Sequence, residues 1–110
     1  MKLSQLEKEL ELRPLQVYKD EEWESAYTSD LLSDVMGNAP GDSVLVTIQG
    51  HKNTVAVATL AGIKAIVLAN GAPATADMLQ AAALENIAIF SSPKDQFHLS
   101  CKIGKILNLP

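Results

Sequence analysis

Residues 43–71 read SVLVTIQGHKNTVAVATLAGIKAIVLANG. A β-branched, apolar run over 43–48 passes through a polar pentad, 49–53, into a helix-like segment over 54–61. A second apolar run follows at 65–69. This order of strand, helix and strand indicates a βαβ unit, in which the two strands are parallel and the crossover is right-handed. The stretch therefore predicts an α/β fold.

The same alternation continues toward the C-terminus. A helix-like segment over 75–85 precedes a strand-like run at 87–90, and a second helix-like segment covers 94–107. Two of the three strands are wholly apolar, as expected when helices cover both faces of a parallel sheet. We therefore expect one domain over residues 1–110, layered, with a mostly parallel sheet flanked by helices.

The first 42 residues are less regular. A short helix is expected over 4–11, because three leucines fall on one face of it: Leu3, Leu6 and Leu10. The alternation at 15–18 after a proline predicts a short strand. A second strand at 26–28 leads into a two-turn helix over 30–36, ended by Gly37 and Asn38.

Composition restricts the functional class. The net charge is −4, no arginine follows Arg13, and no basic run is interleaved with aromatics, so nucleic-acid binding is not expected. One cysteine, Cys101, cannot form an internal disulfide, which favours a reducing cytoplasm; we expect a packed side chain there. The charged N-terminus does not resemble a signal peptide, and no apolar run approaches the ~20 residues that span a membrane.

The loops after the three regular strands form the candidate site. In parallel α/β sheets ligands bind beyond the carboxyl ends of the strands, and each loop here precedes a helix N-terminus, where free amides and the macrodipole favour anions. The candidate ligand-binding residues are Gln49, Gly50, His51, Lys52, Asn53, Asn70, Gly71, Ser91 and Ser92.

Several segments resemble one known family. They are YTSDLLSDVM at 27–36, VTIQ at 46–49, HKN at 51–53 and VAVA at 55–58, and together they resemble the DRTGG domain family, in particular its small stand-alone members found near iron-only hydrogenase and redox genes. The resemblance implies the fold of the N-terminal domain of HPr kinase/phosphorylase. The sequence differs from the family pattern at Glu22–Ser25, where the family carries Asp-Arg and Thr-Gly-Gly.

The resemblance implies a non-catalytic regulatory or interaction domain. DRTGG domains accompany regulatory modules, and beside CBS domains in some pyrophosphatases they take part in nucleotide-regulated dimers. We therefore expect a homodimer in a redox or hydrogenase system, with no cofactor and with an anionic small ligand sensed at the strand ends. No G-x-x-x-x-G-K-[ST] motif is present, so kinase activity does not carry over.

Two alternatives stay open. One is an adenine-nucleotide-binding module with contacts from Lys52, His51, Asn53 and Asn70. The other is a small enzyme or phosphoacceptor that uses His51, since histidine titrates near neutral pH. No acid or nucleophile adjoins His51 in the sequence. A purely structural interpretation is a solvated turn in which Asn53 caps the following helix. We therefore predict no catalytic residue.

Other polar and aromatic residues carry weaker hypotheses. Asp30 and Asp34 have helical i,i+4 spacing, but as a cap and a solvated residue they need no metal, and we predict no metal site. Trp23 is expected to pack over the sheet or against a partner subunit. The helix over 54–61 is apolar nearly all round, so it is either deeply buried or part of a dimer interface.

Overall fold

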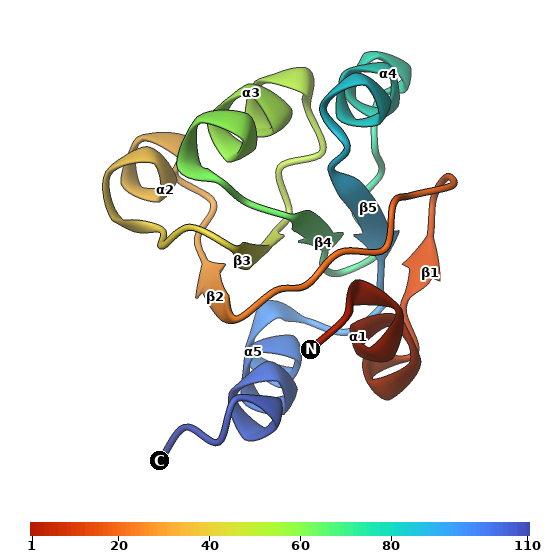
Figure 1. The fold of residues 1–110 in the computed structure, drawn as a ribbon. Helices are drawn as coiled ribbons and strands as arrows, with labels where there is room; N and C mark the ends of the chain where they lie inside the picture. The colour runs from red at the N-terminus through yellow and green to blue at the C-terminus, as the bar shows by residue number, and fades with distance from the viewer.

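Four parallel strands and one antiparallel strand form the sheet of the computed structural model, which describes residues 1–110 (Figure 1). β2 to β5 are parallel, β1 pairs antiparallel with β5, and the spatial order is β1-β5-β4-β3-β2. The strands are β1 (Arg13–Pro14), β2 (Ser25–Thr28), β3 (Ser43–Thr47), β4 (Ala65–Leu68) and β5 (Ala88–Ser91). The predicted α/β class with a mostly parallel sheet is confirmed.

Five helices cover the two faces of this sheet (Figure 1). α1 and α5 pack on one side, here called the α1/α5 face, and the other three helices pack on the α2/α3/α4 face. Side chains alternate along β3, so that Val44 and Val46 point to the first face and Leu45 to the second. The helices are α1 (Leu3–Leu10), α2 (Leu32–Asn38), α3 (Lys52–Ala61), α4 (Ala76–Glu85) and α5 (Gln96–Ile106). None of them is long and apolar enough to cross a membrane.

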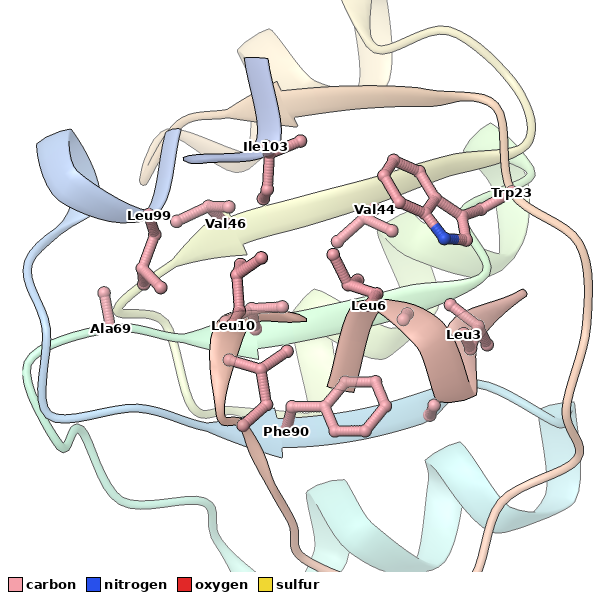
Figure 2. Close-up of a cluster of buried hydrophobic side chains, with 14 residues drawn as sticks. Leu3, Leu6, Leu10, Trp23, Val44, Val46, Ala69, Phe90, Leu99 and Ile103 are labelled. Carbon is pink, nitrogen blue, oxygen red and sulfur yellow. The ribbon is translucent and has the colours of Figure 1, made fainter. Parts of the chain in front are cut away.

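The α1/α5 face holds the largest buried side chains. Figure 2 shows Trp23 beside Val44 in a cluster that also contains Phe90 and the three leucines of α1. Trp23 is 1% exposed, and its indole Nε1 donates a hydrogen bond to the carbonyl of Lys2 (3.3 Å). The ring of Tyr18 meets that of Phe90 edge-on, with centroids 5.0 Å apart. Trp23 thus packs over the sheet, which was one of the two placements expected for it.

The predicted strand over 15–18 is wrong. The strand is Arg13–Pro14, and only the amide of Leu15 makes one further bond to the sheet, to the carbonyl of Ile89 (2.9 Å). Beyond it the chain leaves the sheet: Val17 is 97% exposed and the hydroxyl of Tyr18 donates to Glu7 (2.6 Å). An extended loop shows the same apolar–polar alternation as a strand, and only pairing with a neighbour distinguishes the two.

Helix boundaries and exposure give three further corrections. α2 runs through Gly37 and Asn38, which were expected to end it. α3 begins at Lys52, so Asn53 lies in its first turn and is not its cap. Cys101 is exposed on α5, not packed, because α5 turns its buried side, with Leu99 and Ile103, toward the sheet.

Candidate functional site

The three predicted loops meet at one edge of the sheet, here called the carboxyl edge (residues 49–53, 70–73 and 91–94). Backbone hydrogen bonds join them directly: the Asn70 amide donates to the carbonyl of Lys94 (2.9 Å), and the Thr75 amide donates to that of Gly50 (3.0 Å). The amide of Gly71 donates to the carbonyl of Ser92 (2.8 Å). The topology therefore brings the candidate residues together, as strands of one direction must.

Several of these residues are committed to the loops themselves. A Cβ atom at Gly50 would lie far inside contact distance of the Pro73 carbonyl oxygen, so only glycine lets the two backbones approach. Gly71 has φ +63° and Asn70 has φ +58°, both in the left-handed region of a tight turn. The buried Ser92 hydroxyl accepts from the Lys94 amide (3.1 Å). Their backbone and hydroxyl groups hold the edge in shape.

Ser91 and Gln49 also have structural partners. Ser91 is the last residue of β5 and lies opposite Arg13 in the antiparallel pair. The Gln49 side-chain amide donates to the backbone carbonyl of Asp30 (3.0 Å), and the backbone carbonyl of Gln49 accepts from the Thr54 hydroxyl (2.8 Å). These bonds connect the end of β3 to the chain leaving β2 and to the first turn of α3.

Asp30 is the polar centre of this edge, a role that the sequence did not indicate. Its Oδ1 atom accepts hydrogen bonds from the Thr47 hydroxyl (2.9 Å), the Ile48 amide (2.9 Å) and the Gln96 side-chain amide (2.8 Å). The carboxylate therefore ties the ends of β2 and β3 to the start of α5. No local pattern marks it, because its partners lie 17 to 66 residues away in the chain.

Asp30 and Asp34 do not point to a common site. α2 begins at Leu32, so Asp30 lies outside it and the i,i+4 helical relation to Asp34 does not hold. Asp34 instead accepts from the Tyr27 hydroxyl and from the Asn38 side chain, each at 2.9 Å. Each carboxylate has its own set of donors.

The N-terminus of α3 is the part of the carboxyl edge left open. His51, Lys52 and Asn53 are all exposed, and the amides of Lys52 and Asn53 donate to no acceptor in the chain. The neighbouring helices differ: Thr75 caps α4 through the Met78 amide, and Asp95 caps α5 through the His98 amide. His51 stands at the N-cap position of α3 without a side-chain cap bond.

The electrostatics of this open end are mixed. A hydrogen bond from the Thr75 hydroxyl lowers the pKa of Asp77, and the positive charge of Lys52 contributes to the same lowering. Lys52 is thus partly balanced by a carboxylate at the start of α4. The His51 side chain makes no hydrogen bond to a carboxylate or hydroxyl, so no general-base pair or activated nucleophile is assembled around it.

Most of the clefts of the molecule lie away from this open end, and Lys52 borders one of them. One of about 390 Å³ opens at the amino ends of the strands, between Trp23, Asp42 and Lys64. The Glu21 carboxylate, 3.2 Å from Lys64, raises the pKa of that lysine. Glu22, Trp23 and Glu24, from the segment where the sequence departs from the DRTGG pattern, border this cleft. A second cleft, of about 370 Å³, runs between α3 and α4.

Comparison with known proteins identifies the class of the fold. No protein-family model and no curated protein matches the chain. Among solved structures, it is similar to the regulatory region of Clostridium perfringens pyrophosphatase, which comprises CBS and DRTGG domains and was crystallised with the activator diadenosine tetraphosphate. The TM-score is 0.71 at 12% identity, over 98% of this chain and 47% of that chain.

This likeness supports a DRTGG-like fold, as the sequence resemblance implied. At 12% identity it establishes the fold alone, and the chain spans about half the length of that regulatory region. The matched chain belongs to the regulatory region of the pyrophosphatase.

Proposed function

We propose that this chain is a non-catalytic regulatory domain that binds an anionic small ligand, with an adenine nucleotide as the leading candidate, at the open N-terminus of α3. The observation that carries the proposal is the exposed, uncapped first turn of α3, in which two backbone amides and the Lys52 side chain lie together. The likeness to a regulatory region that binds a nucleotide activator supports the choice of ligand.

The proposed contacts follow from this geometry. A phosphate oxygen would accept from the amides of Lys52 and Asn53, and the macrodipole of α3 favours the negative charge there. The Lys52 ammonium supplies the opposite charge, and His51 supplies a further donor. Asn70 is exposed at the neighbouring loop, and its side chain makes no hydrogen bond within the chain, which leaves it free to contact a base or ribose.

Thermal unfolding with a panel of adenine nucleotides, diadenosine tetraphosphate and inorganic phosphate tests this proposal. A ligand at ~100 times its dissociation constant stabilises the native state by about 2.7 kcal/mol, which raises the midpoint of a domain this size by roughly ten degrees. Lys52→Ala is expected to remove the shift.

The matched control is Lys102→Ala, which removes the same charge from an exposed lysine on α5. It should leave the ligand-induced shift intact. A shift that survives Lys52→Ala would place the ligand elsewhere, and a midpoint unchanged by every nucleotide would contradict the nucleotide proposal.

Homodimerisation through α3 and α4 is the second part of the proposal. The outer sides of these helices are apolar, with Leu60 74% and Leu84 83% exposed beside the cleft between them. α3 is therefore half-covered, not deeply buried, which leaves the interface alternative. Lys52 and Glu85 border the cleft at the start of α3 and the end of α4, so a two-fold axis across it places Lys52 opposite Glu85 of a second copy.

Sedimentation equilibrium distinguishes this dimer from ligand binding. Leu84→Ser should shift the chain to monomer without abolishing a nucleotide-induced rise in midpoint. A wild-type chain that stays monomeric over the accessible concentration range would contradict the dimer. The link to a redox or hydrogenase system is supported by the family resemblance alone, and binding of a purified partner from such a system tests it.

A further inference from the structure

The two lateral edges of the sheet differ in how they are protected. At one edge β1 has two residues, and Pro14 has no amide to offer another strand. At the other edge β2 has four residues, Ser25–Thr28, with neither a charge nor a proline. Proteins block edges that must stay unpaired with charges, prolines or very short strands. β1 carries all three of these devices, in Arg13, Pro14 and its length of two residues, and β2 carries none.

Backbone groups of β2 point away from the sheet. The amides of Ser25 and Ser29 donate to the carbonyls of Asp42 and Val46 on the β3 side. Because direction alternates along a parallel strand, the N–H and C=O groups of Ala26 and Thr28 point outward. The chain supplies no partner for these amides. They form a short ladder open to another strand.

A groove runs alongside this open ladder. Its volume is about 380 Å³, and it lies between β2 and α5. A hydrogen bond of 2.7 Å joins the hydroxyls of Thr28 and Ser100 there. Its floor is widened by Gly104, at which a Cβ atom would meet nothing within 4 Å. The remaining lining is largely apolar, with Ile103, Leu107 and Leu109 from the C-terminal part of the chain.

We propose that β2 and this groove bind an extended segment of a partner protein by strand addition. The ladder recognises the backbone of the segment, and the groove takes its apolar side chains on the α5 side. Glu24, at the amino end of β2, is the one charged residue that lines the groove. An antiparallel segment with a lysine or arginine near its C-terminal end would place that charge beside Glu24.

A second copy of the chain fits this edge less well. The antiparallel register that pairs Ala26 with Thr28 of the second copy also places Glu24 opposite Asp30 of that copy. Like charges directly opposite each other destabilise a strand pair. β2 itself brings no basic residue to the edge. The occupant is therefore a basic, apolar strand from another protein. This surface is separate from the α3 N-terminus, so the inference does not depend on ligand binding there.

The test uses the acetylated hexapeptide amide Thr-Val-Thr-Ile-Thr-Lys and amide hydrogen exchange followed by NMR. At saturation, exchange of the Ala26 and Thr28 amides should slow by at least about tenfold. The same peptide N-methylated at alternate residues keeps its side chains but lacks the donors, and it should give no protection. Equal affinity for both peptides, or no protection at millimolar peptide, would overturn the proposal.

Gly104→Leu provides a variant that fills the groove and favours the helix. It should weaken peptide binding by at least about tenfold, while Val17→Ser, in the exposed loop after β1 at the opposite edge of the sheet, leaves it unchanged. An affinity that Gly104→Leu does not alter would remove the groove from the site. Protection that grows with chain concentration in the absence of peptide would assign the edge to a second copy and overturn the partner segment.

Discussion

The two faces of the sheet are closed in different ways. The α1/α5 face is filled by large side chains that come from distant parts of the chain, including Trp23, Phe90 and the leucines of α1. The α2/α3/α4 face contains no fully buried aromatic residue and is filled by aliphatic and small side chains such as Ala58 and Ala82. Both faces keep exposed apolar side chains on the outer sides of their helices, Phe97 on α5 and Leu60 and Leu84 on α3 and α4. We infer that the large buried side chains of the first face contribute most to the stability of the fold.

Removing Trp23 should have the largest effect. Trp23→Ala deletes a side chain that is 1% exposed and leaves a cavity between α1 and the sheet, so we expect a loss of about 3–5 kcal/mol in the free energy of unfolding. Urea unfolding measures it. Phe97→Ala is the control, since Phe97 is 72% exposed and should cost less than about 0.5 kcal/mol. A loss below ~1 kcal/mol for Trp23→Ala would contradict the stabilising role of this face.

Adding one methyl group at Gly50 tests how closely the two carboxyl-edge loops that lead into α3 and α4 approach each other. Gly50→Ala forces its Cβ against the Pro73 backbone, and we expect a loss of about 1–3 kcal/mol. Gly104→Ala makes the same change in open space within α5 and should raise stability by up to ~1 kcal/mol. Opposite signs in urea unfolding confirm the close approach; equal effects would refute it.

The helix caps sharpen the contrast between α3 and α4. Thr75→Ala removes the hydroxyl that accepts from the Met78 amide and should cost about 1 kcal/mol. His51→Ser supplies a cap that α3 lacks, at a position with the extended backbone of an N-cap, and should gain up to ~1 kcal/mol. Chemical denaturation of the two single variants checks both. If His51→Ser gave no gain, the first turn of α3 would already be satisfied by another group.

The smallest expected effect on stability is the pH-dependent contribution of Asp95 at the start of α5. The His98 amide and then its ring lower the pKa of the Asp95 carboxyl. A lowered native pKa contributes stability above the unfolded value of about 3.9, and this contribution disappears as the pH falls through the native value. The stability difference between the wild type and Asp95→Asn, followed by thermal unfolding, should therefore be greatest above about pH 5 and shrink toward pH 2. A difference independent of pH would exclude the linkage.

Part of the candidate site could be predicted because it depends on strand direction. Once the tandem strand–helix pattern implies parallel strands, the loops holding Lys52, Asn70 and Ser92 must open on one edge. The pattern did not reveal which residues are committed to the loops and which are free. Gly50 packs against the backbone of Pro73 and the Ser92 carbonyl accepts from the Gly71 amide, while His51 and Lys52 are exposed.

Local periodicity in the sequence determined the α/β class, the strands from β2 to β5 and the buried face of α1, because these features repeat over a few residues. Tertiary structure decided what depends on pairing across long separations. The β1 strand forms at Arg13–Pro14 only because β5 offers its edge there. Asp30 becomes the polar centre of the carboxyl edge because Thr47 and Gln96 are folded against it. The open ladder of β2 likewise exists because this strand ends the sheet, and strand order depends on which distant strands pair and is absent from local composition.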